Sequence, residues 1–144
     1  MLFRSDLTGY DVSATVPLVV GDDAHACADP VRGYAALYIG GMGSREQNFY
    51  NRLAVEMGFA DAAGDVQDRY LAKDYDGAAA AVPFEFIDAT ALVGPVDRMA
   101  DKLAEFAAAG MTTCSLAPYG DSVEARVAVL RAAAEALDKS GVGS

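Results

Sequence analysis

Leu37 to Leu53 reads Leu-Tyr-Ile-Gly-Gly-Met-Gly-Ser-Arg-Glu-Gln-Asn-Phe-Tyr-Asn-Arg-Leu and places three glycines within four residues. Glycine loses more conformational entropy on folding than any other residue, so this run indicates positive φ angles or a close approach to the backbone. Ser44 and Gln47 are typical of a capping box and predict a helix that begins at Ser44. Two interpretations are open: the loop and helix N-terminus hold a phosphate or carboxylate, or Gly40 simply ends one helix in a left-handed cap.

The segment before this loop predicts a strand followed by a helix. Residues Ala14 to Val20 are largely β-branched and apolar on both faces, which suits a parallel strand covered by helices. Asp22 or Asp23 then caps a helix over residues 24–39. Pro30 lies inside that helix, and we expect it to kink or restart the helix.

The segment after the loop predicts a series of helices. Apolar residues four apart, Phe49, Leu53 and Met57, favour a helix over residues 44–57. Phe84 to Val93 is interpreted as a helix, although its last four residues would also serve as a strand. The remaining helices before the next strand are predicted over residues 61–72, 77–82 and 96–109.

The end of the chain predicts one more strand and one more helix. Met111 to Ala117 follows directly from the helix that Gly110 ends, as in a βα repeat. Pro118, Tyr119 and Gly120 turn out of this strand, and a capped helix follows over residues 123–137. We therefore divide the chain into an irregular start at residues 1–12, a folded part at 13–138 and a frayed tail at 139–144.

Composition and charge exclude several classes of function. The 144 residues are 53% apolar, which is enough for the core of one domain. Acidic residues outnumber basic ones by 21 to 11 and no positive stripe is present, so nucleic acid and anionic membrane are poor partners. No apolar run approaches the roughly 18 residues of a membrane span, and we expect a cytoplasmic protein. Cys27 and Cys114 lie far apart with no histidine cluster, so no metal site is indicated.

The sequence predicts only two strands among about six helical pieces. Two strands alone cannot form a sheet that is covered on both faces. The alternation of strand and helix instead fits the last two units of an eight-stranded barrel, whose usual length of about 250 residues far exceeds this chain. The order of elements therefore predicts that the chain is part of something larger.

Three blocks of the sequence together resemble one family. They are Leu-Tyr-Ile-Gly-Gly-Met-Gly-Ser-x-x-x-Asn-Phe-Tyr, the Ala-Ala-Ala-Val-Pro run at 79–83, and Ala-Leu-Val-Gly-Pro followed by an amphipathic helix and Ala-Gly-Met-Thr-Thr. Over residues 13–137 the chain resembles the C-terminal portion of the luciferase-like flavin and deazaflavin oxidoreductases, particularly the F420-dependent members.

The resemblance implies an α/β fold, a partial TIM (β/α)8 barrel made of the last two βα units with a helical insertion between them. Residues 15–20 would be strand seven, 112–117 strand eight and 44–93 the insertion. Family members transfer hydride between F420 or FMN and a small organic substrate, and they are often homodimers. The strands that carry most of the cofactor pocket would precede Met1, so we expect a fragment that is inactive alone. The alternatives are an FMN-dependent monooxygenase and a catalytically inert remnant.

The resemblance and the position of each residue give a set of candidate site residues. Barrel active sites lie where strands end, and we expect the glycine loop to fold over this rim. Tyr119 follows the last strand and is a candidate substrate contact, as is Asn48. A lone histidine in the position of His25 is more often solvated on a helix than catalytic. No catalytic residue is assigned. The candidate cofactor-binding residues are Gly40, Gly41, Met42, Gly43 and Ser44.

Overall fold

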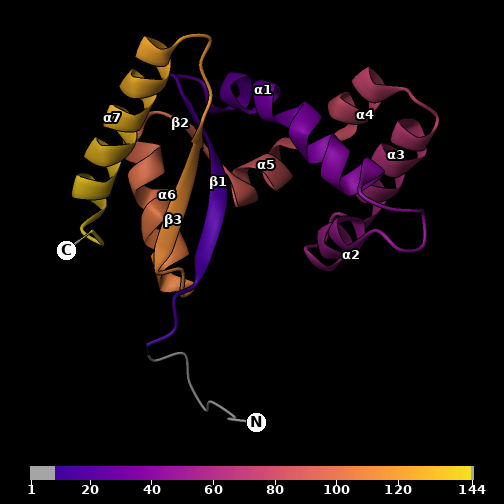
Figure 1. The fold of residues 1–144 in the computed structure, drawn as a ribbon, viewed down its shortest axis with the longest axis horizontal. Helices are drawn as coiled ribbons and strands as arrows, with labels where there is room; N and C mark the ends of the chain where they lie inside the picture. The colour runs from indigo at the N-terminus through magenta and orange to yellow at the C-terminus, as the bar shows by residue number, and fades with distance from the viewer. Residues whose placement is uncertain (1–8, 144) are drawn as a thin grey trace.

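The computed structural model describes residues 9–143. At its centre lies one sheet of three parallel strands in the order β2-β1-β3 (Figure 1). Val16 of the central strand lies beside Leu116, so the two segments predicted to be strands are neighbours in the sheet. The strands are β1 (Ser13–Val20), β2 (Leu92–Gly94) and β3 (Thr113–Pro118).

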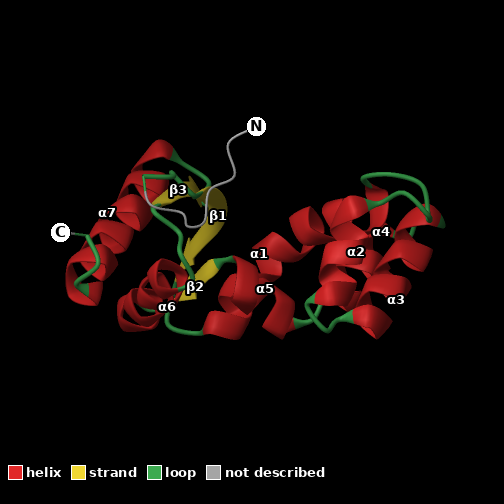
Figure 2. Ribbon diagram, turned by 90° about the horizontal axis from the view of Figure 1, so that it is seen from below, coloured by secondary structure: helices red, strands yellow, loops and turns green. Residues whose placement is uncertain are grey.

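Helices cover the sheet unevenly. Two long helices, α6 and α7, pack on each other and on one face of the sheet, whereas α1 and α5 lie on the opposite side near the carboxyl ends of the strands (Figures 1 and 2). Beyond α1, three further helices form a lobe that lies away from the sheet (Figure 2). Within residues 9–143 the helices are α1 (Ala24–Ala36), the π-helical extension η1 (Leu37–Gly41), α2 (Phe49–Glu56), α3 (Ala60–Leu71), α4 (Tyr75–Ala81), α5 (Phe84–Thr90), α6 (Val96–Ala108) and α7 (Val123–Ser140).

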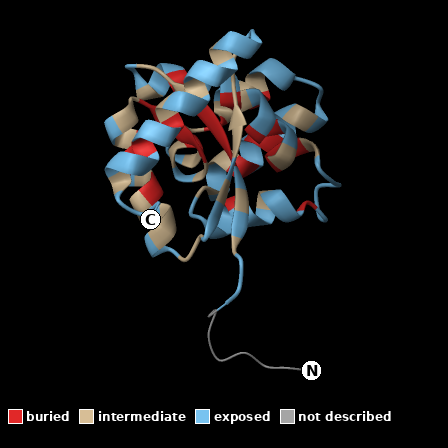
Figure 3. Cartoon of the chain, turned by 60° about the vertical axis from the view of Figure 1, so that its left-hand side comes forward, coloured by how far each residue is buried: buried red, intermediate tan, exposed pale blue. Residues whose placement is uncertain are grey.

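Two apolar clusters lie on opposite sides of the sheet. Because side chains alternate along a strand, Val16 and Leu18 of β1 point toward α6 and α7, and Val19 points toward α1. Leu18 is completely buried, as is Ile87 of α5 in the second cluster. Figure 3 shows the buried residues along the sheet and on the inward faces of the helices, while the outward faces are exposed.

One face of the sheet is bare toward its amino end. Ser13 and Thr15 of β1 are exposed, and their partners in register, Thr113 and Ser115 of β3, are exposed as well. All four side chains carry hydroxyl groups and point to the face opposite α6 and α7. This face is therefore open at the sheet's amino end, whereas α1 covers it near the carboxyl end.

The helix after the glycine run begins later than predicted. We expected it to start at Ser44, but α2 starts at Phe49 with Asn48 as its N-cap, and the Asn48 Oδ1 accepts a hydrogen bond from the Asn51 N–H at 3.0 Å. The Ser44 carbonyl instead accepts from the Gln47 N–H and closes a turn. The predicted capping box is wrong because Asn48, a strong capping residue, takes that role four residues later.

The segment over residues 84–93 is only partly helical. Helix α5 ends at Thr90, and Leu92–Gly94 forms the third strand, which pairs in parallel with β1. The helix prediction fails at its end because Leu92 and Val93 are buried within the sheet and Gly94 turns sharply with φ +108°. This strand lies outside β1, not between β1 and β3, which differs from the order of consecutive strands in a closed barrel.

The remaining helices follow the predicted pattern closely. Pro30 does not restart the first helix, since α1 runs through it and continues as η1 to Gly41. The predicted helix over 96–109 is confirmed, and Gly110 follows it with φ +102°. Helix α7 runs to Ser140, three residues beyond its predicted end. Most of the predicted irregular start, residues 1–8, lies outside the described part of the chain.

Candidate functional site at the carboxyl end of the sheet

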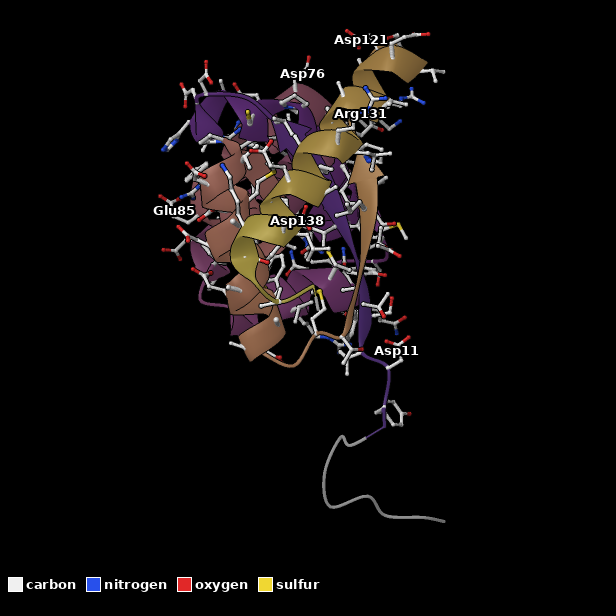
Figure 4. All side chains as sticks on the ribbon, turned by 90° about the vertical axis from the view of Figure 1, so that its left-hand side faces the viewer. Asp11, Asp76, Glu85, Asp121, Arg131 and Asp138 are labelled. Atoms are coloured by element: carbon white, nitrogen blue, oxygen red, sulfur yellow. The ribbon has the colours of Figure 1, made fainter. Side chains whose placement is uncertain are left out.

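The carboxyl ends of the three strands meet at one edge. The Gly21 N–H after β1 donates to the Gly94 carbonyl of β2 at 3.2 Å, and the Tyr119 N–H after β3 donates to the Leu18 carbonyl at 3.0 Å. Asp121 lies at this end of the molecule and Asp11 at the opposite end (Figure 4). Open parallel sheets bind ligands at the carboxyl ends of their strands, so this edge is the candidate site.

Asp23, one of the two acidic residues predicted to cap the first helix, is the N-cap of α1. The Asp23 Oδ1 accepts from the N–H groups of His25 and Ala26 at the start of α1. The ring of His25 stacks on Phe84 of α5, with ring centroids 3.7 Å apart. This stacking gives His25 a packing role between two helices. Among residues 9–143 no three His, Cys, Asp or Glu side chains are grouped to hold a metal ion.

The glycine loop lies far from the sheet edge. Helix α1 has 13 residues and carries the loop roughly 20 Å away from the end of β1, at 1.5 Å per residue (Figure 1). The expectation that the loop folds over the strand ends is therefore wrong in this structure. The cofactor-binding role assigned to its residues stays a prediction.

Two of the loop glycines are explained by packing. A Cβ at Gly40 would overlap the Cβ of Tyr70 on α3, and a Cβ at Gly41 would overlap the Tyr70 ring. Both glycines thus let η1 approach α3 closely. The open part of the loop is its second half, where Met42, Gly43 and Ser44 are exposed and Gly43 has φ +148°.

Asn48 is almost completely buried, with 1% of its surface exposed. Its Nδ2 donates to the carbonyls of Tyr38 and Ile39 at 3.0 and 2.9 Å, while its Oδ1 caps α2. The side chain therefore joins the end of η1 to the start of α2. Its substrate-binding role stays a prediction, because a substrate contact would have to replace one of these bonds.

Tyr119 is half-buried, and its phenol influences that of Tyr34 electrostatically. We call Tyr119, Tyr34, Tyr38 and Tyr50 together the tyrosine row. The ring centroids of Tyr34 and Tyr38 on α1 and η1 are 4.7 Å apart, and those of Tyr38 and Tyr50 on α2 are also 4.7 Å apart. The ring contacts thus connect α1 and η1 with α2, the helix that follows the glycine loop.

The hydroxyl groups of the row influence one another. A hydrogen bond with the Tyr38 hydroxyl, followed by burial and by the neighbouring phenols of Tyr119 and Tyr50, raises the pKa of Tyr34 to about 12. Burial also raises the pKa of Tyr119. Each phenol is disfavoured as an anion, because phenolates close together repel each other and lose solvation. Both groups therefore stay protonated at neutral pH.

Tyr34 and Tyr38 were missed as site residues in the sequence. Their spacing of four on a helix places them on one face, which is a signal that could have found them. The electrostatic influence of Tyr119 on Tyr34 joins segments 85 residues apart in the chain and had no local signal.

Among the hollows on the surface of the described residues, two border the strands of the sheet. A shallow one of about 480 Å³ borders Tyr119 and is also lined by Gly120, Asp121 and Arg126. A larger cavity of about 560 Å³ lies between α6, α7 and β3 and is mostly apolar. The shallow hollow adjoins the tyrosine row at Tyr119.

Comparison with known proteins places this chain in a family. The model of the luciferase-like monooxygenase family matches residues 3–113. A Mycobacterium tuberculosis protein named "Putative coenzyme F420-dependent oxidoreductase" is 32% identical over 109 residues, which cover 76% of this chain and 31% of that protein. This chain thus spans about a third of the length of that relative. No solved structure matches this chain. The matched family model covers well over half of the residues, and the chain belongs to the luciferase-like monooxygenase family.

Proposed function

We propose that this chain is the C-terminal part of an oxidoreductase that transfers hydride between deazaflavin F420 and a small organic substrate. The observation that carries the proposal is the 32% identity to a relative named for F420-dependent oxidoreduction. The bound cofactor would supply the hydride chemistry, and the protein would supply binding and orientation. Because the chain spans only about a third of that relative, the activity is proposed for the whole protein.

The proposal includes the barrel suggested by the sequence. In a (β/α)8 barrel the helices lie outside and the active site lies at the carboxyl ends of the strands. The packing of α6 and α7 on one face of the sheet supports this arrangement. The bare face with Thr15 and Ser115 would then point to the barrel interior. A closed barrel would have to change two features: the position of β2 outside β1, and the packing of α1 and α5 on the side of the sheet that would become the interior.

Residues Met42, Gly43 and Ser44 are the part of the loop that fits a cofactor group. Their exposure leaves backbone N–H groups accessible to a phosphate or carboxylate, and Gly43 holds a backbone angle that other residues rarely adopt. Gly40 and Gly41 are covered by Tyr70 and would support the loop from behind. FMN is the alternative cofactor, since flavins are the other cofactors of this family.

The test is a titration of the purified chain with F420 and, separately, with FMN, followed by fluorescence and by thermal unfolding. A ligand that binds only the folded state raises the unfolding temperature. Stronger binding of F420 than of FMN is expected, and the reverse would favour the FMN-dependent alternative. Cooperative unfolding without binding of either would contradict a cofactor site within this chain and favour an inert remnant.

A matched pair of variants locates the cofactor group. Gly43→Ala should weaken F420 binding, because an added Cβ would lie 2.9 Å from the Gln47 carbonyl oxygen and distort the loop. Gly110→Ala is the control, since Gly110 also has a positive φ but an added Cβ there meets nothing within 4 Å. Equal losses in both variants would show only a general loss of stability and contradict the loop's role.

A further inference from the structure

Helix α7 is apolar on two faces. Its inward face, which includes the buried Ala133 and Ala136, packs against the sheet and α6. Its outward face carries a second set of apolar residues, all exposed and spaced alternately four and three apart. We call this set the α7 stripe: Val123, Val127, Leu130, Ala134 and Leu137. Apolar residues at this spacing form a narrow seam that packs against another helix.

Strand β3 has a free edge. Among residues 9–143 it pairs only with β1. The N–H groups of Thr113 and Tyr119 donate hydrogen bonds toward the β1 side, and N–H groups alternate in direction along a strand, so those of Cys114 and Leu116 point away from β1. Charged side chains usually protect an edge strand from pairing, but β3 contains none. Its free edge is therefore able to accept another strand.

The α7 stripe and the free edge of β3 border the same apolar hollow. The cavity of about 560 Å³ is lined by Leu130 and Leu137 of the stripe and by Cys114 and Leu116 of β3. Helix α7 and β3 also contact each other directly, and Figure 4 shows them side by side on this face of the molecule. The helix face, the hollow and the strand edge thus form one continuous surface.

The two halves of this surface require different elements from whatever covers it. A strand satisfies the free backbone groups of β3, whereas a helix fits the α7 stripe. A second copy of the chain offers both elements next to each other. When it is related by a twofold axis, its β3 runs antiparallel to β3 and its α7 runs antiparallel to α7. The surface is therefore complementary to itself.

The charges beside the α7 stripe select an antiparallel helix pair. Glu124 and Arg131 each directly follow a residue of the stripe, so they flank it on one side, and among residues 9–143 neither forms an ion pair. Antiparallel helices bring these equivalent flanks together. When Val127 packs against the partner's Leu130, Glu124 of each copy lies beside the partner's Arg131. Two attractive charge pairs then form.

Other arrangements of the two helices are disfavoured by charge. Moving the antiparallel pair by one heptad would place Arg131 beside the partner's Arg131. A parallel pair would bring opposite flanks together and place Arg126 beside the partner's Arg131. Both arrangements put like charges side by side, which is unfavourable.

We propose that this chain forms a twofold dimer in which the α7 stripe packs antiparallel on the partner's α7 and the two β3 edges pair into one continuous sheet. Glu124 and Arg131 set the register of the helices, and the dimer covers the apolar hollow. A closed barrel would use the edge of β3 for its own first strand, so the dimer is proposed for this chain by itself. The inference goes beyond the proposed function and depends on neither the cofactor nor the reaction.

The test is sedimentation equilibrium of the purified chain at several concentrations. An ionic strength of about 0.15 M screens the long-range repulsion between copies that each carry a net charge of −10. We expect a dimer whose fraction rises with concentration. A chain that is still monomeric at about 1 mM would overturn the proposal.

Charge reversal tests the register of the helices. Arg131→Glu should weaken the dimer at least about tenfold, because two attractive pairs become two repulsive ones. Glu124→Arg should have a similar effect, and the double reversal should recover the dimer because it restores opposite charges. Arg52→Glu is the control, since it makes the same charge change on the exposed surface of α2. A dimer that is unaffected by Arg131→Glu, or not recovered by the double reversal, would contradict this interface.

Two further measurements locate the contact. Val123→Asp should weaken the dimer and leave the chain folded, because Val123 is 70% exposed and an acidic residue is favourable in the first turn of a helix. Thermal unfolding checks the folding of each variant. Hydrogen exchange of the Cys114 and Leu116 amides should slow as the dimer forms, since strand pairing protects them. Exchange that stays equally fast in monomer and dimer would overturn the pairing of the β3 edges.

Discussion

The Nδ2 of Asn48 donates a hydrogen bond to the Ile39 carbonyl at 2.9 Å, and this bond lies almost completely out of solvent. It ties the π-helical end of the first helix to the N-terminus of α2, where the same side chain accepts from the Asn51 N–H. Two helix ends that would otherwise leave polar groups unpaired are thus satisfied by one residue.

Asn48→Ala should lower the free energy of unfolding by about 1–3 kcal/mol, because it leaves buried carbonyls without a donor and removes a helix cap. Urea denaturation followed by circular dichroism measures this change. Gln47→Ala is the neighbouring control, since the Gln47 side chain is exposed. Equal stability of the two variants would contradict the structural role of Asn48.

Gly41 and Tyr70 should show a coupled effect on stability. Gly41→Ala is expected to cost about 1–3 kcal/mol because the new Cβ would overlap the Tyr70 ring. Adding Tyr70→Ala should remove the clash, so the glycine substitution should cost less in that background. Gly40→Ala should not be rescued in this way, because its clash is with the Tyr70 Cβ, which alanine retains.

The control for this cycle is Gly64→Ala on α3. A Cβ at Gly64 meets nothing within 4 Å, and replacing an exposed helical glycine by alanine should stabilise the chain by about 0.5–1 kcal/mol. A double-mutant cycle from denaturation curves measures the coupling between Gly41 and Tyr70. A coupling energy near zero would show that η1 and α3 do not approach as closely as the structure indicates.

The parts of the fold that the sequence predicted well are those with a local signal. The helix Val96–Ala108 has apolar residues at helical spacing, and Asp23 precedes its helix as a capping residue. The strand Leu92–Gly94 has only three residues, and its identity depends on pairing with β1, which no local pattern reveals. Ser44 failed as a cap because Asn48 makes additional tertiary hydrogen bonds.

The candidate site was only partly predictable for the same reason. Tyr119 was found because it follows a strand. The importance of Tyr34 depends on its contact with Tyr38 and on the approach of Tyr119, which brings together distant parts of the chain. The glycine run attracted attention by its composition, yet Gly40 and Gly41 face Tyr70, a residue whose role appears only after the helices pack.

Stability at alkaline pH should depend on Tyr34. Its folded-state pKa of about 12 exceeds the ordinary value of 10, so the folded state holds this proton more tightly. The resulting stabilisation is fully present below pH 10 and is lost as the pH rises from 10 to 12. Ultraviolet absorbance of the phenolates and denaturation curves across this range measure both effects.

Tyr38→Phe tests the cause of that shift. The hydrogen bond between the two hydroxyls is the largest contribution to the raised pKa of Tyr34. The variant should therefore lower the pKa of Tyr34 and reduce the loss of stability at alkaline pH. Tyr75→Phe should leave both curves unchanged. An unchanged Tyr34 titration in Tyr38→Phe would show that the hydroxyls do not interact in solution.

The two cysteines should react slowly with thiol reagents near neutral pH. Both are free, and burial raises the pKa of each, so little of the reactive thiolate is present. Cys114 should react before Cys27, because it lines the apolar cavity of about 560 Å³, whereas Cys27 is only 7% exposed. Ellman's reagent with the Cys114→Ser and Cys27→Ser variants assigns the two rates. Faster reaction of Cys27 would show that α1 separates from β1 more readily than the cavity beside β3 admits the reagent.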